Sequence, residues 1–124
     1  MSDAANAERG EHEIELEGVT YRLRPSHAAI SRIEQLTERS LLDLTRLGNV
    51  GGLTLGECGI VAAELIRAGA AEDDKATRNV GAKRIGELVF EAGLHRAMAR
   101  LTLCLIDAAS GGRTASGEAK PAAA

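Results

Sequence analysis

The sequence predicts a mainly α-helical protein of the α+β class: an N-terminal two-stranded antiparallel β-hairpin followed by four to five helices packed as a small bundle. Near its start the 124-residue chain alternates apolar and polar side chains with the period of a strand, and later it places apolar residues at helical spacing. One Phe, one Tyr and no Trp leave aliphatic residues and Ala to fill the core, which favours closely packed helices.

The hairpin is predicted from the segment EIELEGVTYRLR at residues 13–24. We expect Gly18 and Val19 to form its two-residue loop, because the first central position of a type II′ turn has a positive φ that costs glycine little. Pro25 then ends the second strand. The cross-strand pairs expected from this register are Leu16 with Tyr21, Ile14 with Leu23, Glu15 with Arg22, and Glu13 with Arg24.

The first two helices are predicted from their N-caps. Ser26 and Ser40 are the expected caps, since a serine hydroxyl accepts a hydrogen bond from a free N–H of the first turn. The first helix is predicted to run to about Arg39, and the short second helix to Leu47. The sequence GNVGG at residues 48–52 then breaks the helix and predicts a chain reversal.

Two further helices are predicted in the middle of the chain. Thr54 followed three residues later by Glu57 is a capping-box pattern, and the helix that starts there is expected to end near Gly69. After a polar connection, Thr77 is the expected cap of a fourth helix that ends at Gly93. Each of these helices has an apolar face, so we expect both to pack against the core.

The last helix, predicted from Leu94 to about Ala109, has the strongest apolar stripe and is expected at the centre of the core. Ala99, Leu103 and Ile106 form a second apolar row on another side of it. This row either packs under the hairpin or the short second helix, or forms an exposed patch that receives another protein. The apolar residues off the stripe of their own helix are the candidate partner-binding residues: Ile60, Phe90, Leu103 and Ile106.

The hairpin offers a second recognition surface, because an open strand edge can pair with an extended segment of a partner. The glutamates at positions 13, 15 and 17 are more typical of a role in solubility. Residues 1–11 and 111–124 are polar or rich in Gly, Ser and Ala. We expect both segments to be disordered tails around a single domain at residues 12–110.

No catalytic, cofactor-binding or metal-binding residue can be assigned from the sequence. The three histidines, at positions 12, 27 and 95, are far apart, and the motifs HxxxH, CxxC and GxSxG do not occur. We therefore expect a protein that is not an enzyme and that uses no cofactor and no metal.

Cysteine placement and hydropathy predict the cellular setting. Cys58 and Cys104 lie on predicted apolar helix faces, where we expect reduced thiols, as in a cytoplasmic protein. No apolar run reaches the roughly 20 residues of a membrane span, so no membrane partner is expected.

The charge of the chain argues against broad nucleic-acid binding, since the net charge is −3 and the pI is near 5.6. A helix-turn-helix DNA reader is nevertheless the alternative from another functional class. Its recognition helix would lie in the fourth predicted helix, where basic and amide residues are interleaved with acids. These residues are Lys75, Arg78, Asn79, Lys83 and Arg84.

Four segments occur in an order that is similar to one protein family: ELEGVTYRLRPS (15–26), IEQL (33–36), GLTLGE (52–57) and VGAKRIGELVFEAGL (80–94). Over about residues 12–109 the chain resembles the small tail-assembly proteins of gene transfer agents and related siphophages, of the tail-assembly-chaperone type. The hairpin and the EAGL turn at 91–94 carry most of the resemblance. The hairpin residues concerned are Leu16, Tyr21, Leu23, Arg24 and Pro25.

The resemblance implies a non-enzymatic function in assembling a phage-like tail. Tail-assembly chaperones of this type coat the apolar tape-measure protein before tail-tube subunits polymerise around it, and they are absent from the finished tail. The implied partners are the tape-measure protein, the tail tube protein or both. We also expect that the chain can form a homo-oligomer, and its charge and hydropathy predict neither nucleic acid nor membrane as a partner. The alternative is a structural tail-tube or minor tail component, located in the particle and not in the host cytoplasm. The source would be a gene transfer agent or a prophage.

Overall fold

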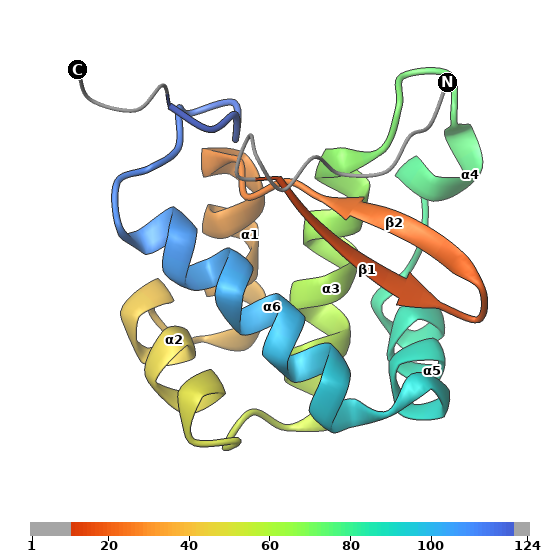
Figure 1. The fold of residues 1–124 in the computed structure, drawn as a ribbon, viewed down its shortest axis with the longest axis horizontal. Coiled ribbons are helices and arrows are strands. Elements are labelled where there is room, and N and C mark those ends of the chain that lie inside the picture. The colour runs from red at the N-terminus through yellow and green to blue at the C-terminus, as the bar shows by residue number, and fades with distance from the viewer. Residues whose placement is uncertain (1–10, 121–124) are drawn as a thin grey trace.

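Residues 11–120 are described by the computed structural model of this chain, and they form the predicted mainly α-helical fold with an N-terminal hairpin (Figure 1). Residues 1–10 and 121–124, which belong to the predicted tails, lie outside the described part. Six helices follow the hairpin in this part of the chain, and α4 is a single turn. In chain order the elements are β1 (His12–Leu16), β2 (Val19–Leu23), α1 (His27–Thr37), α2 (Leu41–Asn49), α3 (Leu55–Gly69), α4 (Lys75–Arg78), α5 (Ala82–Ala92) and α6 (Leu94–Ala109).

The hairpin has the predicted strands but a different loop. Its two loop residues are Glu17 and Gly18, with φ values of 50° and 76°. Two consecutive positive φ values are those of a type I′ turn, whose twist matches the twist of the flanking strands. The observed pairs are His12 with Leu23, Glu13 with Arg22, Ile14 with Tyr21, Glu15 with Thr20, and Leu16 with Val19.

The predicted register is therefore wrong by two residues. Gly18 is the second loop residue and not the first, and Val19 begins the second strand. The shift leaves the two faces of the hairpin unchanged, because side chains alternate with a period of two. Ile14, Leu16 and Leu23 are all buried in the core, as the sequence pattern predicted.

The predicted caps of the first three helices are confirmed. Ser26, Ser40 and Thr54 each accept a hydrogen bond from the backbone N–H three residues later, with an oxygen–nitrogen distance of 3.1 Å in every case. Glu57 completes the capping box by accepting a hydrogen bond from the N–H of Thr54 at 2.9 Å. The helix starts were predictable because a cap is a contact within one turn.

Two other helix boundaries differ from the prediction. Thr77 is not the cap of the fourth long helix; Asp74 caps the single turn α4 and accepts a hydrogen bond from the N–H of Thr77 at 3.1 Å. The long helix α5 begins only after Gly81, without a side-chain cap. α2 continues to Asn49, beyond the predicted end at Leu47, because its last turn packs against α6.

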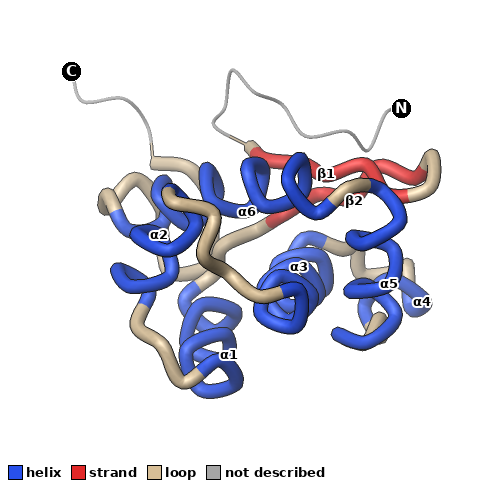
Figure 2. The backbone as a smooth tube through the Cα atoms, turned by 90° about the horizontal axis from the view of Figure 1, so that it is seen from below, coloured by secondary structure: helices blue, strands red, loops and turns tan. Residues whose placement is uncertain are grey.

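α3 is the central helix of the fold, a place that the sequence pattern assigned to the last helix. It packs against α1, α5, α6 and β2. Figure 2 shows α1, α3 and α5 on one side of the molecule and the hairpin with α6 on the other. The largest fully buried side chains include Leu16, Ile33, Leu44, Leu65, Ile66, Ile85, Leu101 and Leu105.

Two glycines allow neighbouring elements to approach the backbone of α3. A Cβ added at Gly69 would lie 2.3 Å from the carbonyl oxygen of Arg22 in β2, and one added at Gly59 would lie 2.9 Å from a carbonyl oxygen of α5. Near Gly69, the carbonyl oxygen of Leu65 accepts a hydrogen bond from the N–H of Arg24 at 3.1 Å. The hairpin is therefore held against the end of α3 by backbone contacts that leave no room for a side chain.

Residues 111–120 fall within the predicted C-terminal tail, yet they fold back toward the start of α1. The carbonyl oxygen of Ala115 accepts a hydrogen bond from the N–H of His27 at 2.8 Å. Arg113 has a buried side chain that forms an ion pair with Asp107 at the end of α6. These contacts order a segment whose composition predicted disorder, so the tail prediction does not hold for it.

The Glu57 carboxylate is bound by two partners. It accepts hydrogen bonds from the backbone N–H of Thr54 and from the Arg39 guanidinium. Burial acts to raise the pKa of Glu57, but these hydrogen bonds outweigh it and hold the pKa below its ordinary value. The start of α3 is thus stabilised by a charged carboxylate.

We predict that Gly69→Ala destabilises the protein by about 1–3 kcal/mol, because the added methyl meets backbone that cannot move without displacing the hairpin. Gly56→Ala is the matched control in the same helix, since its Cβ would have no neighbour closer than the Thr54 Oγ1 at 3.9 Å. Alanine also forms helix better than glycine, so this variant should be as stable as the wild type or more stable. Urea unfolding measures both, and equal effects would contradict the close packing of β2 on α3.

The lowered pKa of Glu57 predicts that stability depends on pH. A carboxylate whose pKa is lower in the folded state stabilises the fold above its ordinary value of 4.5, and this contribution is lost as the pH falls through the folded value. The wild type should therefore exceed Glu57→Gln in free energy of unfolding at pH 7 by more than it does at about pH 3. Urea titrations at both pH values test this, and a difference independent of pH would contradict it.

Candidate functional site

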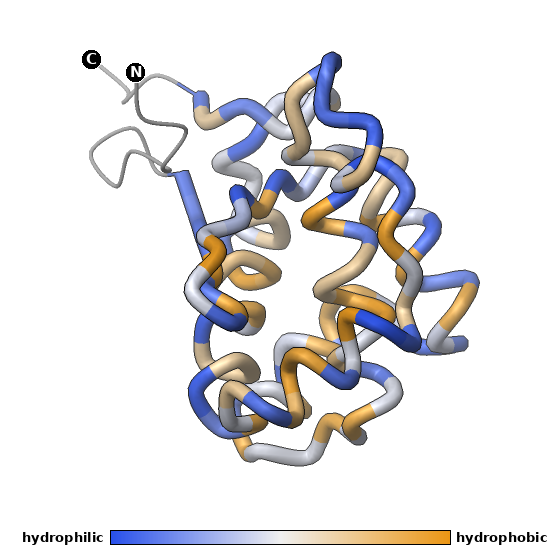
Figure 3. Tube along the Cα trace, turned by 90° about the vertical axis from the view of Figure 1, so that its right-hand side faces the viewer, coloured by the Kyte–Doolittle hydropathy of each residue, from blue (hydrophilic) through white to orange (hydrophobic). Residues whose placement is uncertain are grey.

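Three of the four predicted partner-binding residues are exposed. The exposed fractions are 67% for Phe90, 54% for Leu103 and 38% for Ile106, whereas Ile60 is partly buried. Figure 3 shows apolar and polar residues interleaved along the helices. Exposed large apolar residues occur on α1, α2, α5 and α6. The second apolar row of the last helix is thus not buried under the hairpin or α2.

The structure does not bring the four predicted residues together. Leu103 and Ile106 line a hollow between the end of α2 and α6, whereas Phe90 lines a separate groove between α3 and α5. Ile60 lines neither of them, and the two hollows share no lining residue. They are therefore two distinct candidate surfaces.

The first surface, the α2–α6 patch, consists of Val50, Leu103 and Ile106. These residues line a hollow of about 550 Å³ whose walls are the C-terminal end of α2 and one face of α6. The Val50 side chain is 73% exposed. Sequence reasoning missed Val50, because the surrounding glycines were interpreted only as a helix breaker. α2 in fact continues to Asn49 and places Val50 beside α6.

α2 and α6 approach each other closely at Gly48 and Thr102. A Cβ added at Gly48 would lie 2.2 Å from the Thr102 Oγ1, so a larger residue at this position would force the threonine to move. Thr102 is buried, and its Oγ1 has no hydrogen-bond partner within residues 11–120. The residues that line the hollow are mostly apolar or small, and Asn49, His95 and Thr102 are the polar ones.

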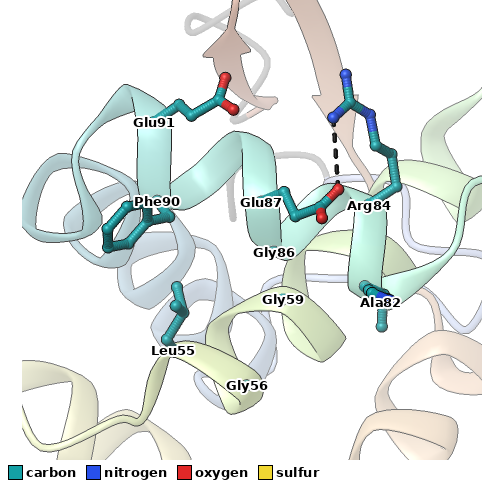
Figure 4. A pocket seen from close by; sticks show the side chains of 10 residues that line it. Leu55, Gly56, Gly59, Ala82, Arg84, Gly86, Glu87, Phe90 and Glu91 are labelled. Carbon is teal, nitrogen blue, oxygen red and sulfur yellow. Dashed lines mark hydrogen bonds and ion pairs between the residues drawn. The ribbon is translucent and has the colours of Figure 1, made fainter.

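The second surface, the α3–α5 groove, has a volume of about 590 Å³ (Figure 4). Small residues from both helices line it: Gly56, Gly59, Ala82 and Gly86. The large apolar side chains are those of Leu55 and Phe90, and Leu55 points toward Phe90. The middle of the groove is thus lined by small residues, and one exposed aromatic ring lies at its rim.

Charged side chains follow the edge of the groove that faces the hairpin. Arg84 binds Glu87 at 3.4 Å, as Figure 4 shows, and approaches Glu17 of the hairpin loop at 3.8 Å. A hydrogen bond to Glu17 and the negative charge of Glu17 raise the pKa of the Glu91 carboxyl. Along α5 the edge is basic at Lys83 and Arg84 and acidic at Glu87 and Glu91.

The ionisable groups outside these surfaces have structural surroundings. Burial raises the pKa of Cys58 to about 11 and that of Cys104 to about 12, so both thiols are protonated and poorly nucleophilic at neutral pH. His12 contacts Asp107 at 2.9 Å, and Asp107 also binds Arg113, which joins β1, α6 and the C-terminal segment. Among the described residues, no group of three or more His, Cys, Asp or Glu is placed to hold a metal ion.

Neither membrane-spanning helices nor similar proteins identify the function of this chain. No helix within residues 11–120 has both the length and the apolar character needed to cross a membrane. No family model, curated protein or solved structure matches this chain. The resemblance to tail-assembly proteins stays a prediction.

We predict that Phe90→Ala and Leu103→Ala each change the free energy of unfolding by no more than about 0.5 kcal/mol, because both side chains are largely in water. Leu88→Ala on α5 and Leu101→Ala on α6 are the matched buried controls, and each should cost about 2–5 kcal/mol. Chemical denaturation of the four variants measures the difference. A loss at Phe90 or Leu103 as large as that of the controls would show that these residues belong to the core.

Proposed function

We propose that this protein is a non-enzymatic assembly factor for the tail of a gene transfer agent or phage-like particle, and that it acts as a chaperone that binds the tape-measure protein. The α2–α6 patch carries the proposal, because Val50, Leu103 and Ile106 are exposed on neighbouring elements around one hollow. Contiguous apolar surface on a small domain usually binds another molecule. The order of sequence segments shared with tail-assembly proteins supports the choice of client.

An apolar helical segment of the client suits the shape of the patch. The hollow has one wall from the end of α2 and one from α6, so a helix laid in it meets apolar side chains on two sides. Helix-in-groove binding uses client residues spaced by three, four and seven positions. Because burial gains roughly 25 cal/mol per Å² of apolar surface, a patch of three side chains gives modest affinity, which suits a client that is later released.

Reversible binding favours the chaperone over a structural component of the tail tube or minor tail. A permanent tube subunit needs extended strands to build a closed ring, whereas the sheet within the described residues has two strands of five residues each. The alternative of DNA binding has less support, because Arg84 is already close to Glu17 and Glu87.

Co-expression with the neighbouring tape-measure and tail-tube proteins, followed by affinity capture of the tape-measure protein, tests the proposal. The wild type should co-purify with the tape-measure protein. The double variant Leu103→Glu/Ile106→Glu should weaken capture at least about tenfold, because it places charges in the apolar contact. Leu36→Glu, an exposed apolar site on α1, is the matched control and should bind like the wild type. Undiminished capture of a folded double variant would contradict the role of the patch.

Analysis of purified particles distinguishes the two roles in tail assembly. A chaperone should be present in complexes with the tape-measure protein and absent from mature particles. Stoichiometric presence in mature particles would instead identify a structural component and would contradict the chaperone role.

A further inference from the structure

We propose that the α3–α5 groove receives α5 of a second copy of this chain, which gives a two-fold symmetric dimer with the two α5 helices antiparallel. This surface shares no lining residue with the α2–α6 patch. The dimer therefore does not depend on the binding of a client, and each can fail without the other.

The apolar row of α5 is complementary to itself in size. Ala82, Gly86 and Phe90 are spaced by four residues, so they lie on one side of the helix, and all three line the groove. In an antiparallel pair with the two-fold axis at Gly86, each glycine faces its counterpart. Phe90 of each copy then faces Ala82 of the other copy, since both are four residues from the axis. Large side chains thus meet small ones, as in a well-packed helix interface.

The groove has space for the aromatic ring of a second copy. A Cβ added at Gly59 would lie 3.1 Å from the Gly86 Cα, so α3 and α5 are in backbone contact along the groove. This contact fills the space beside Gly59, so the room for an incoming Phe90 ring lies on the open side of the groove, over the small residues Ala82 and Gly86. A phenylalanine side chain buries about 150–250 Å² when it is covered, and this one is 67% exposed in the single chain.

The charges along the groove are complementary in the same arrangement. With the two-fold axis at Gly86, position 85 of one copy is opposite Glu87 of the other, and position 81 is opposite Glu91. Lys83 lies midway between these two positions, about 3 Å along the helix axis from each. Along the helix axis, Lys83 of one copy therefore lies between two glutamates of the other. In the single chain Glu17 lies beside Glu91, and the positive charge of Arg84 offsets these two carboxylates only in part. Lys83 of the second copy adds a positive charge near them.

These features favour a second copy over an unrelated helix. A parallel pair of α5 helices would place Lys83 against Lys83 and Phe90 against Phe90, so the sizes and charges match only in the antiparallel orientation. The contact consists of one helix pair and the adjoining groove, which is at the low end of protein interfaces in size. We therefore expect a dissociation constant of about 10–100 µM.

Sedimentation equilibrium of the full chain, from about 1 µM to about 500 µM, brackets the expected dissociation constant and tests the proposal. The wild type should change from monomer to dimer over this range. Phe90→Ala should weaken the dimer at least about tenfold, whereas Leu42→Ala, with an equally exposed side chain on α2, should dimerise like the wild type. A wild type that stays monomeric, or a dimer that Phe90→Ala leaves unchanged, overturns the proposal.

A pair of charge-reversal variants tests the orientation. Lys83→Glu/Arg84→Glu and Glu87→Lys/Glu91→Lys should each be monomeric, because each brings like charges together across the two-fold axis. An equimolar mixture should form a heterodimer, since the opposite charges are restored between the two chains. A mixture that stays monomeric although both variants are folded overturns the antiparallel arrangement. If a reversal variant does not fold, the comparison of Phe90→Ala with Leu42→Ala decides. Binding of a single client segment, measured in parallel at a concentration at which the wild type is monomeric, should be unchanged in Phe90→Ala.

Discussion

The close approach of β2 and α5 to the backbone of α3 is the constraint on which the rest of the fold depends. Gly69 admits the carbonyl group of Arg22, and Gly59 admits the backbone of α5. Side chains from β2, α1, α5 and α6 then pack against α3 and form one core with those of β1 and α2. Because α3 is covered on most sides, the neighbouring helices need to contribute only one face each. The outer faces of α5 and α6 are left for other contacts.

These two outer faces differ in chemistry, and the difference suits two kinds of partner. The residues that line the α2–α6 patch include no Asp, Glu, Lys or Arg, so this surface can bind apolar segments of varied sequence. The α3–α5 groove has two basic and two acidic residues along one helix, which select a partner in one orientation. A protein that coats a long client benefits from both properties, because contacts between neighbouring copies raise the effective concentration of each client-binding surface.

Local features of the fold were predictable from the sequence, and features that depend on distant residues were not. The N-caps of α1, α2 and α3 and the exposed apolar residues of α5 and α6 follow from spacing within a few turns. The hairpin register was not predictable from the sequence, because Gly18 suits either loop position. The choice depends on whether Glu17 adopts a positive φ. The contact of Gly48 with Thr102, which places Val50 beside α6, joins residues far apart in the chain.

Hydrogen exchange of the free protein and of its complex with the tape-measure protein is the most direct test that α3 supports the fold and that the α2–α6 patch binds the client. The amides of α3 should exchange slowest in both samples, through global unfolding only. The complex should add protection at the end of α2 and in α6, and little elsewhere. Amides of α3 that exchange as fast as those of α2, or added protection that avoids α6, would contradict this view of the molecule.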